Sequence, residues 1–168
     1  QRSRQIGWLH FVAMASHDYV KEMGPYKKGD QPGAHRWIEY APFRLMSGSW
    51  EVWFQRQKVE VAPFTFTNSL VTTVNAVREG VGIGLLPIYM AINMQDLRPL
   101  DAGLRLKFPI WLDTDFDSLD TPELSIALGL ISSAIDPQVM PWFRDEVTAL
   151  PDLDDWRKIR DVAIARLG

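Results

Sequence analysis

Short apolar blocks alternate along this chain with segments of helical periodicity. Apolar runs of strand length cover residues 8–15 and 81–86, and shorter candidates cover 35–40 and 108–112. Weak alternation predicts a strand at 50–55, and clearer alternation predicts another at 58–66. The second of these contains Pro63, which favours a sheet edge or a strand end.

The clearest helical pattern begins directly after residue 69. Its apolar stripe consists of Leu70, Val74, Val77 and Val81. Asn68 or Ser69 would cap the start of this helix, and Gly80 would end it.

Two further helices are predicted from their caps. Ser16 precedes a short helix over residues 18–23, and Thr121 precedes a helix that runs from Pro122 to about residue 135. Because strands and helices alternate, the fold class is predicted to be α/β with a largely parallel or mixed sheet.

The composition changes after residue 135. Pro137, Pro141 and Pro151 separate two more helical patterns, so residues 136–168 are expected to form a C-terminal helical extension. The last pattern, over residues 154–167, has an apolar face formed by Trp156, Ile159, Ala163 and Leu167. Such a face is expected to dock on the domain, and partner binding is the alternative.

The bulk composition is that of one ordinary globular domain or a little more. The chain has 168 residues, of which 46% are apolar and 23% charged, with a net charge of −3 and no cysteine. This charge gives no electrostatic reason to approach DNA, and the lack of cysteine excludes disulfides and Cys-bound metals. No apolar run approaches the roughly 20 residues of a membrane span, so no membrane association is expected.

Two segments resemble ligand motifs only in part. The glycines of residues 80–84 follow a helix and precede a strand, which is the reverse of the order in a phosphate-binding loop, so they are interpreted as a helix end with tight packing. The acidic loop at residues 113–117 has calcium-like spacing, but Ser118 and Leu124 stand where that motif needs a glycine and a glutamate. A solvated loop is the favoured interpretation.

The remaining chemistry gives no reason to expect an enzyme. His10, His17 and His35 fall on three separate predicted segments without metal-ligand spacing, and no nucleophile motif is present. We therefore expect no catalytic residue, metal or cofactor. Trp50 and Trp53 could line a small-molecule pocket, although core packing is favoured.

The best candidate site lies where the strand over 58–66 leads into the helix after residue 69. Thr65, Thr67, Asn68 and Ser69 place hydroxyl and amide groups at this junction. Ligands of open α/β sheets bind beyond the carboxyl ends of strands, and the first N–H groups of a helix favour an anion. Helix capping alone would also explain these residues, and the two roles are compatible.

The same residues carry a resemblance to a known family. Residues 64–87 (FTFTNSLVTTVNAVREGVGIGLLP) resemble the segment of LysR-type transcription regulators in which a capped helix leads through a glycine-rich turn into a strand ending Leu-Pro. Residues 11–24 (FVAMASHDYVKEMG), residues 33–40 (GAHRWIEY) and the last strand and helix, residues 109–112 and 121–135, are similar to other segments of that family in the same order.

The resemblance implies a periplasmic-binding-protein-like fold of type 2. The effector-binding domain would cover residues 1–135, with crossover strands at about 8–15 and 108–112. The second subdomain, about 12–108, would be complete. The first would be represented only by residues 113–135, its other elements preceding Gln1 in an N-terminally truncated chain.

The resemblance also implies a function. The chain would be the effector-sensing domain of a cytoplasmic, bacterial, DNA-binding regulator that forms homodimers or homotetramers, with DNA contacted only through a missing N-terminal domain. Its effector is a small molecule, expected to be anionic, with Thr67, Asn68 and Ser69 as ligand contacts and Phe66 packing nearby. The alternatives are a free-standing periplasmic solute-binding protein of the same fold and an enzyme that uses the acidic loop at 113–117.

Overall fold

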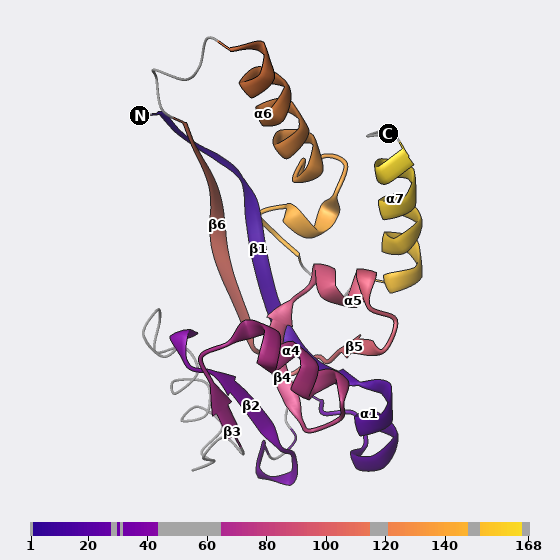
Figure 1. Ribbon diagram of the computed structural model, residues 1–168. Coiled ribbons are helices and arrows are strands. Elements are labelled where there is room, and N and C mark those ends of the chain that lie inside the picture. Colours follow the sequence, from indigo (N-terminus) through magenta and orange to yellow (C-terminus); the bar gives the residue numbers. More distant parts are fainter. Residues whose placement is uncertain are drawn as a thin grey trace. The chain divides into compact units, whose positions relative to one another are not determined.

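The computed structural model divides the chain into two compact units (Figure 1). It describes residues 2–27, 30, 32–43, 65–114, 121–147 and 152–165. Unit 1 comprises residues Gln1–His10 and Lys107–Gly168, and unit 2 comprises Phe11–Leu106. The predicted strand at 50–55 and most of the one at 58–66, with Trp50 and Trp53, lie outside the described residues.

A mixed sheet forms the centre of unit 2. Its order is β3-β2-β4-β1-β5, with bounds β1 Arg2–Ser16, β2 Trp37–Tyr40, β3 Thr65–Thr67, β4 Ile83–Pro87 and β5 Leu97–Pro99. Strands β3, β2 and β4 are parallel, whereas β1 is antiparallel to both β4 and β5. The predicted class, an α/β protein with a mixed sheet, is confirmed.

The register aligns the carboxyl ends of two parallel strands. Tyr40 at the end of β2 is paired with Thr67 at the end of β3. The backbone N–H of Ala41 donates to the carbonyl of Thr67 at 2.9 Å, which ties the loop after β2 to the end of β3. The loops that follow these two strands therefore start at the same edge of the sheet.

The first helix of unit 2, α1 (His17–Met23), follows β1 without a loop. The side chain of Ser16 caps it by accepting the N–H of Tyr19 at 3.1 Å, as predicted. The helix ends at Gly24, whose backbone φ of 80° lies in the left-handed region that residues with a side chain rarely adopt.

The helix with the clearest sequence pattern, α4 (Leu70–Arg78), packs on the sheet through Thr73, Val74 and Val77. It ends in a Schellman motif, in which Gly80 (φ 73°) donates to the carbonyl of Val77 and Val81 donates to that of Ala76. The predicted helix end at Gly80 is confirmed, and Val81 lies beyond the helix.

Gly84 on β4 lets α4 approach the sheet closely. A Cβ atom at residue 84 would lie 2.8 Å from Cγ2 of Val77 and 3.4 Å from Cγ2 of Thr73. The glycine-rich run therefore serves packing, as its helix-before-strand order predicts. Gly82 has a different neighbour, because a Cβ there would lie 2.6 Å from the carbonyl oxygen of Arg36.

Two short elements of unit 2 were not predicted. Helix α5 (Tyr89–Asn93) and strand β5 follow β4, and they hold the buried residues Ala91, Ile92 and Leu97. Each has five residues or fewer, which is too short for a periodic pattern to emerge.

Unit 1 contains parts of two long strands and the C-terminal helices. Strand β6 (Arg105–Thr114) pairs with β1, and α6 (Pro122–Ala134), η3 (Pro141–Phe143) and α7 (Leu153–Ala165) follow it. Thr121 is the N-cap of α6 and Pro122 opens the helix, as predicted. The cap acts through the backbone, because the carbonyl of Thr121 accepts the N–H of Ser125 while its hydroxyl makes no capping hydrogen bond.

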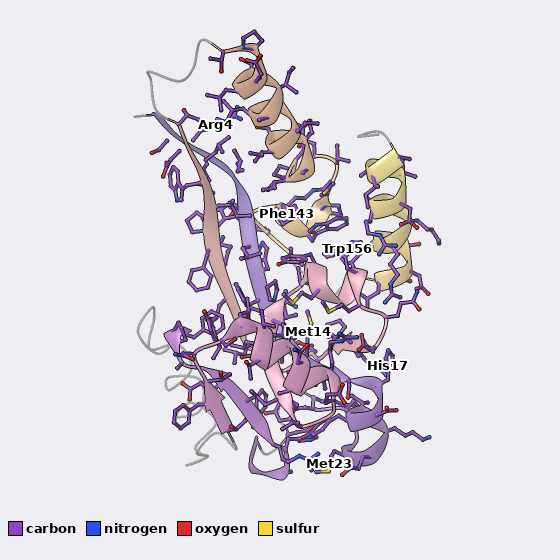
Figure 2. All side chains as sticks on the ribbon, in the orientation of Figure 1. Arg4, Met14, His17, Met23, Phe143 and Trp156 are labelled. Carbon is purple, nitrogen blue, oxygen red and sulfur yellow. The ribbon has the colours of Figure 1, made fainter. Side chains whose placement is uncertain are left out.

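The C-terminal segment of unit 1 has a small core of its own. Trp142 is buried, and its ring packs against that of Trp156 on α7 with centroids 5.6 Å apart. Trp156 is labelled in Figure 2. Met140 and Ala163 are also buried. Of the predicted apolar face of α7, Trp156 packs on Trp142 of the same C-terminal segment and Ala163 is buried, whereas Ile159 is 36% exposed and Leu167 lies outside the described residues. Docking of this face on residues 1–135 stays a prediction.

Candidate functional site

The candidate site lies at the junction of β3 and α4 in unit 2. The short strand β3 delivers Thr67 to the carboxyl edge of the sheet, and α4 begins three residues later at Leu70. Asn68 and Ser69 fill the turn between them. The structure therefore brings together all the residues that the sequence singled out for ligand contact.

The two hydroxyl groups of the turn both accept backbone hydrogen bonds. Oγ1 of Thr67 accepts the N–H of Ser69 at 3.1 Å, and Oγ of Ser69 accepts the N–H of Thr72 at 3.2 Å. Ser69 is thus the N-cap of α4, and Asn68 is not. The carbonyl of Ser69 accepts the hydroxyl of the buried Thr73 at 3.0 Å, which fixes the turn to the helix.

These bonds determine what the turn can offer to a ligand. A hydroxyl that accepts a backbone N–H keeps its own hydrogen for donation. Thr67 and Ser69 are half-buried, and Asn68 is exposed, its amide making no hydrogen bond with the described residues. The turn therefore presents two hydroxyl donors and one amide group next to the N-terminus of α4, where the helix dipole favours negative charge.

An aromatic cluster lies at the same edge of the sheet. Phe43, just beyond β2, makes edge-to-face contacts with Phe11 at 4.9 Å and with Tyr40 at 5.1 Å between ring centroids. Phe11 is paired with Pro87 at the carboxyl end of β4. Sequence analysis missed these residues, because only the strand register reveals that Tyr40 and Thr67 end side by side.

Two residues beside the turn differ sharply in exposure. The side chain of Phe66 is 72% exposed, so it has little packing within unit 2 and is available to a ligand. Its partner in the β2–β3 register is Glu39, which is 1% exposed. A buried acidic residue in this strand was not predicted.

The described residues give no support to a metal site. Within the described ranges, no three His, Asp or Glu side chains gather as a metal site would require. Most of the acidic loop at 113–117 lies outside those ranges. Of the histidines, His10 is buried with Nε2 2.6 Å from the carbonyl of Arg144, His17 is exposed, and His35 is half-buried.

No helix in the described ranges has the length and hydropathy that crossing a bilayer requires.

Comparison with known proteins identifies the family. Residues 2–133, more than half of the chain, match the LysR substrate binding domain. The chain belongs to this family. No match was obtained among curated protein sequences.

Solved structures of LysR-type regulators share the fold of this LysR substrate-binding domain. The regulatory domain of CrgA from Neisseria meningitidis superposes with a TM-score of 0.60 at 18% identity, over 79% of this chain and 68% of that one. Full-length LysG from Corynebacterium glutamicum with bound effector Arg superposes with a TM-score of 0.51 at 18% sequence identity, over 79% of this chain and 46% of LysG. The bromide-bound regulatory domain of HypT from Salmonella typhimurium superposes with a TM-score of 0.55 at 16% sequence identity, over 79% of this chain and 65% of the HypT chain.

These matches confirm the family and the periplasmic-binding-protein-like fold expected from the sequence. They agree with the effector-binding domain of a LysR-type regulator, and they give no support to the alternative of a free-standing solute-binding protein. The chain spans about half the length of full-length LysG, since the match covers 46% of the LysG chain.

Proposed function

We propose that this domain senses a small anionic effector that is bound at the junction of β3 and α4. Thr67, Asn68 and Ser69 would contact the anionic group, and Phe66 would pack against the body of the ligand. The observation that carries the proposal is the hydrogen bonding of the turn, which leaves both hydroxyl hydrogens free to donate.

The surroundings of the turn support an anion over a cation. The N-terminus of α4 carries the positive end of the helix dipole, and α4 has no acidic residue in its first turn. The bromide ion on HypT is a small anion, and the Arg on LysG carries a carboxylate beside its positive groups, so both proteins of this fold hold a ligand with a negative group. The exposed Phe66 and the nearby aromatic cluster supply the apolar surface that ligand sites generally combine with a few polar groups.

The proposed arrangement of subdomains follows the division of the chain into units. The second subdomain would cover about 12–108, and the compact unit Phe11–Leu106 supports this proposal. Strands β1 and β6 contribute residues to both units, as crossover strands do. Residues 113–135 would then belong to the first subdomain, and residues 136–168 would form a helical extension of it.

The proposed role in the cell is that of a regulator without catalytic activity. The domain would act in the cytoplasm as part of a homodimer or homotetramer. Effector binding would favour one of two arrangements of the sensing domains and so change how a separate N-terminal domain holds DNA.

The test is a ligand screen with a matched pair of variants. Small carboxylates, with acetate, succinate and benzoate as the first probes, are added to the 168-residue chain, and the shift in its melting temperature is measured. At least one carboxylate should raise the melting temperature, whereas its uncharged amide analogue should not. The Thr67→Ala/Asn68→Ala variant should lose this shift.

The control removes the same kinds of side chain from the exposed surface of α4, away from the turn. Thr72 and Asn75 have exposed side chains on α4, so Thr72→Ala/Asn75→Ala should keep the wild-type shift. Normal carboxylate binding by Thr67→Ala/Asn68→Ala would refute the proposed site. Binding of amides as strongly as carboxylates would refute the proposed anion.

A further inference from the structure

A polar pocket lies wholly within unit 1, and none of its lining residues belongs to the proposed effector site. It has a volume of about 320 Å³, and its wall is formed by the start of β1 and the end of α6. The residues that give it chemical character are Arg4, Ser132, Ser133 and Asp136, and Ile6 and Pro137 add apolar surface. Its size falls at the lower end of the range for small-molecule sites, about 300–1,000 Å³.

Arg4 provides a positive group with unused donors. Nη2 of Arg4, a residue labelled in Figure 2, donates to Oγ of Ser132 at 2.7 Å. Arg4 forms no ion pair with any carboxylate of the described residues. A guanidinium group has five N–H donors, so a single bond to a hydroxyl leaves most of them available. The hydroxyl of Ser132 accepts from Arg4 and therefore keeps its own hydrogen for donation. Together these groups suit a carboxylate, which the planar guanidinium can bind through two parallel bonds.

The opposite charge is supplied by the end of α6 and the turn after it. Helix α6 ends at Ala134, and its C-terminal carbonyls carry the negative end of the helix dipole. Asp136 lines the same pocket, and its Oδ1 accepts the N–H of Gln138 at 2.8 Å, which holds the carboxylate in place. Asp136 forms no ion pair within the part of the chain that the structure describes. This wall suits an ammonium group.

We infer that this pocket binds a small molecule that carries both a carboxylate and an ammonium group, such as a free amino acid. A ligand with only one charge would leave either Arg4 or Asp136 without a partner, and it would face the charge of its own sign on the other wall. A zwitterion can satisfy both groups at once, because it brings a carboxylate for Arg4 and an ammonium group for Asp136. The inference extends beyond the proposed effector site, because its residues lie in unit 1.

The experiment uses the 168-residue chain labelled with ¹⁵N. The common L-amino acids are added one at a time, and propionate and ethylamine serve as probes that carry one charge each. At least one amino acid should shift the amide signals of residues 4–6 and 132–137. Both single-charge probes should bind at least about ten-fold more weakly, as expected when a charged partner is lost.

Variants separate the pocket from the effector site. Arg4→Met and Asp136→Asn should each weaken amino-acid binding about ten-fold or more, whereas Arg4→Lys should retain part of it because the charge stays. Arg98→Met removes an exposed arginine of unit 2 and should leave binding unchanged. Thr67→Ala should also leave it unchanged, so failure of the proposed effector site would not affect this result.

Three outcomes would overturn the inference. The first is that no amino acid shifts the signals of residues 4–6 and 132–137 at millimolar concentration. The second is binding that Arg4→Met and Asp136→Asn both leave intact in variants whose spectra show a folded chain. The third is equal binding of propionate or ethylamine and the amino acid.

Discussion

The phenol oxygen of Tyr19 accepts the backbone N–H of Arg36 at 2.9 Å, joining α1 to the start of β2. The same oxygen lies 3.2 Å from Nδ1 of His35, and the guanidinium of Arg36 lies over the Tyr19 ring. Arg36 continues the chain of contacts, because its side chain donates to the carbonyls of Gly80 and Val81 at the end of α4. One tyrosine hydroxyl thus links elements that are distant in sequence, and Tyr19 is buried.

Removing this hydroxyl should destabilise unit 2. In Tyr19→Phe, the N–H of Arg36 and Nδ1 of His35 both lose a partner at a partly buried place. The free energy of unfolding, measured with urea, should fall by about 1–3 kcal/mol. Tyr40→Phe is the matched control, because the Tyr40 hydroxyl forms no hydrogen bond with the described residues and its loss should change stability little. Equal effects of the two substitutions would contradict this assignment.

Lowering the pH should destabilise the contacts among Tyr19, His35 and Arg36, because His35 becomes protonated. Burial lowers the pKa of His35, and the nearby Arg36 lowers it further, whereas Asp30 raises it in part. The unfolded chain, with a histidine pKa of about 6.5, therefore binds more protons than the folded chain as the pH falls below that value. The stabilisation by neutral His35 is complete above about pH 6.5 and is lost as the pH falls from there towards the lowered pKa of the folded state.

This pH dependence can be isolated by substitution. His35→Gln has no proton to gain at this position, so its unfolding free energy should decrease less between about pH 7.5 and pH 5 than that of the wild type. His17→Gln, at an exposed histidine on α1, should keep the wild-type dependence. Identical pH profiles for His35→Gln and the wild type would show that His35 is not the titrating group.

Gly84→Ala should overpack the contact between α4 and β4. The new Cβ would lie 2.8 Å from Cγ2 of Val77, a buried residue that has little room to move. We expect a loss of about 1–3 kcal/mol in unfolding free energy, partly restored by the second substitution Val77→Ala. Gly129→Ala on α6 is the control, since nothing lies within 4 Å of a Cβ there and the helix should gain up to about 1 kcal/mol.

Trp156→Ala should loosen α7 from unit 1. The substitution removes the ring that packs on Trp142, and the expected loss is about 1–3 kcal/mol, below the range of about 3–5 kcal/mol for fully buried aromatics, because Trp156 is half-buried. Hydrogen exchange of the α7 amides should become faster. Ile164→Ala, at a side chain that is 58% exposed, should leave this exchange unchanged. Unchanged exchange in Trp156→Ala would mean that the Trp142 contact does not hold the helix.

Much of the local structure could be predicted from the sequence, because its causes lie within a few residues. Ser16 caps α1 and Gly80 ends α4 through bonds to residues at most four positions away, so the residue types alone indicate them. The same reasoning placed Thr67, Asn68 and Ser69 together in one turn. It left open whether Asn68 or Ser69 caps α4, since either side chain can do so.

Interactions between distant residues were decided only by the tertiary structure. The bond of Arg4 to Ser132 spans 128 positions, and the proximity of Tyr40 to Thr67 depends on which strands pair. The burial of Glu39 likewise follows from the packing around β2 and from no feature of the strand itself. The sequence by itself determined the cap of α1, the end of α4, the apolar stripe of α4 and the resemblance to the family. The three-dimensional packing decided which polar groups share a pocket, because hydrogen bonds and ion pairs act over a few ångströms whatever the separation along the chain.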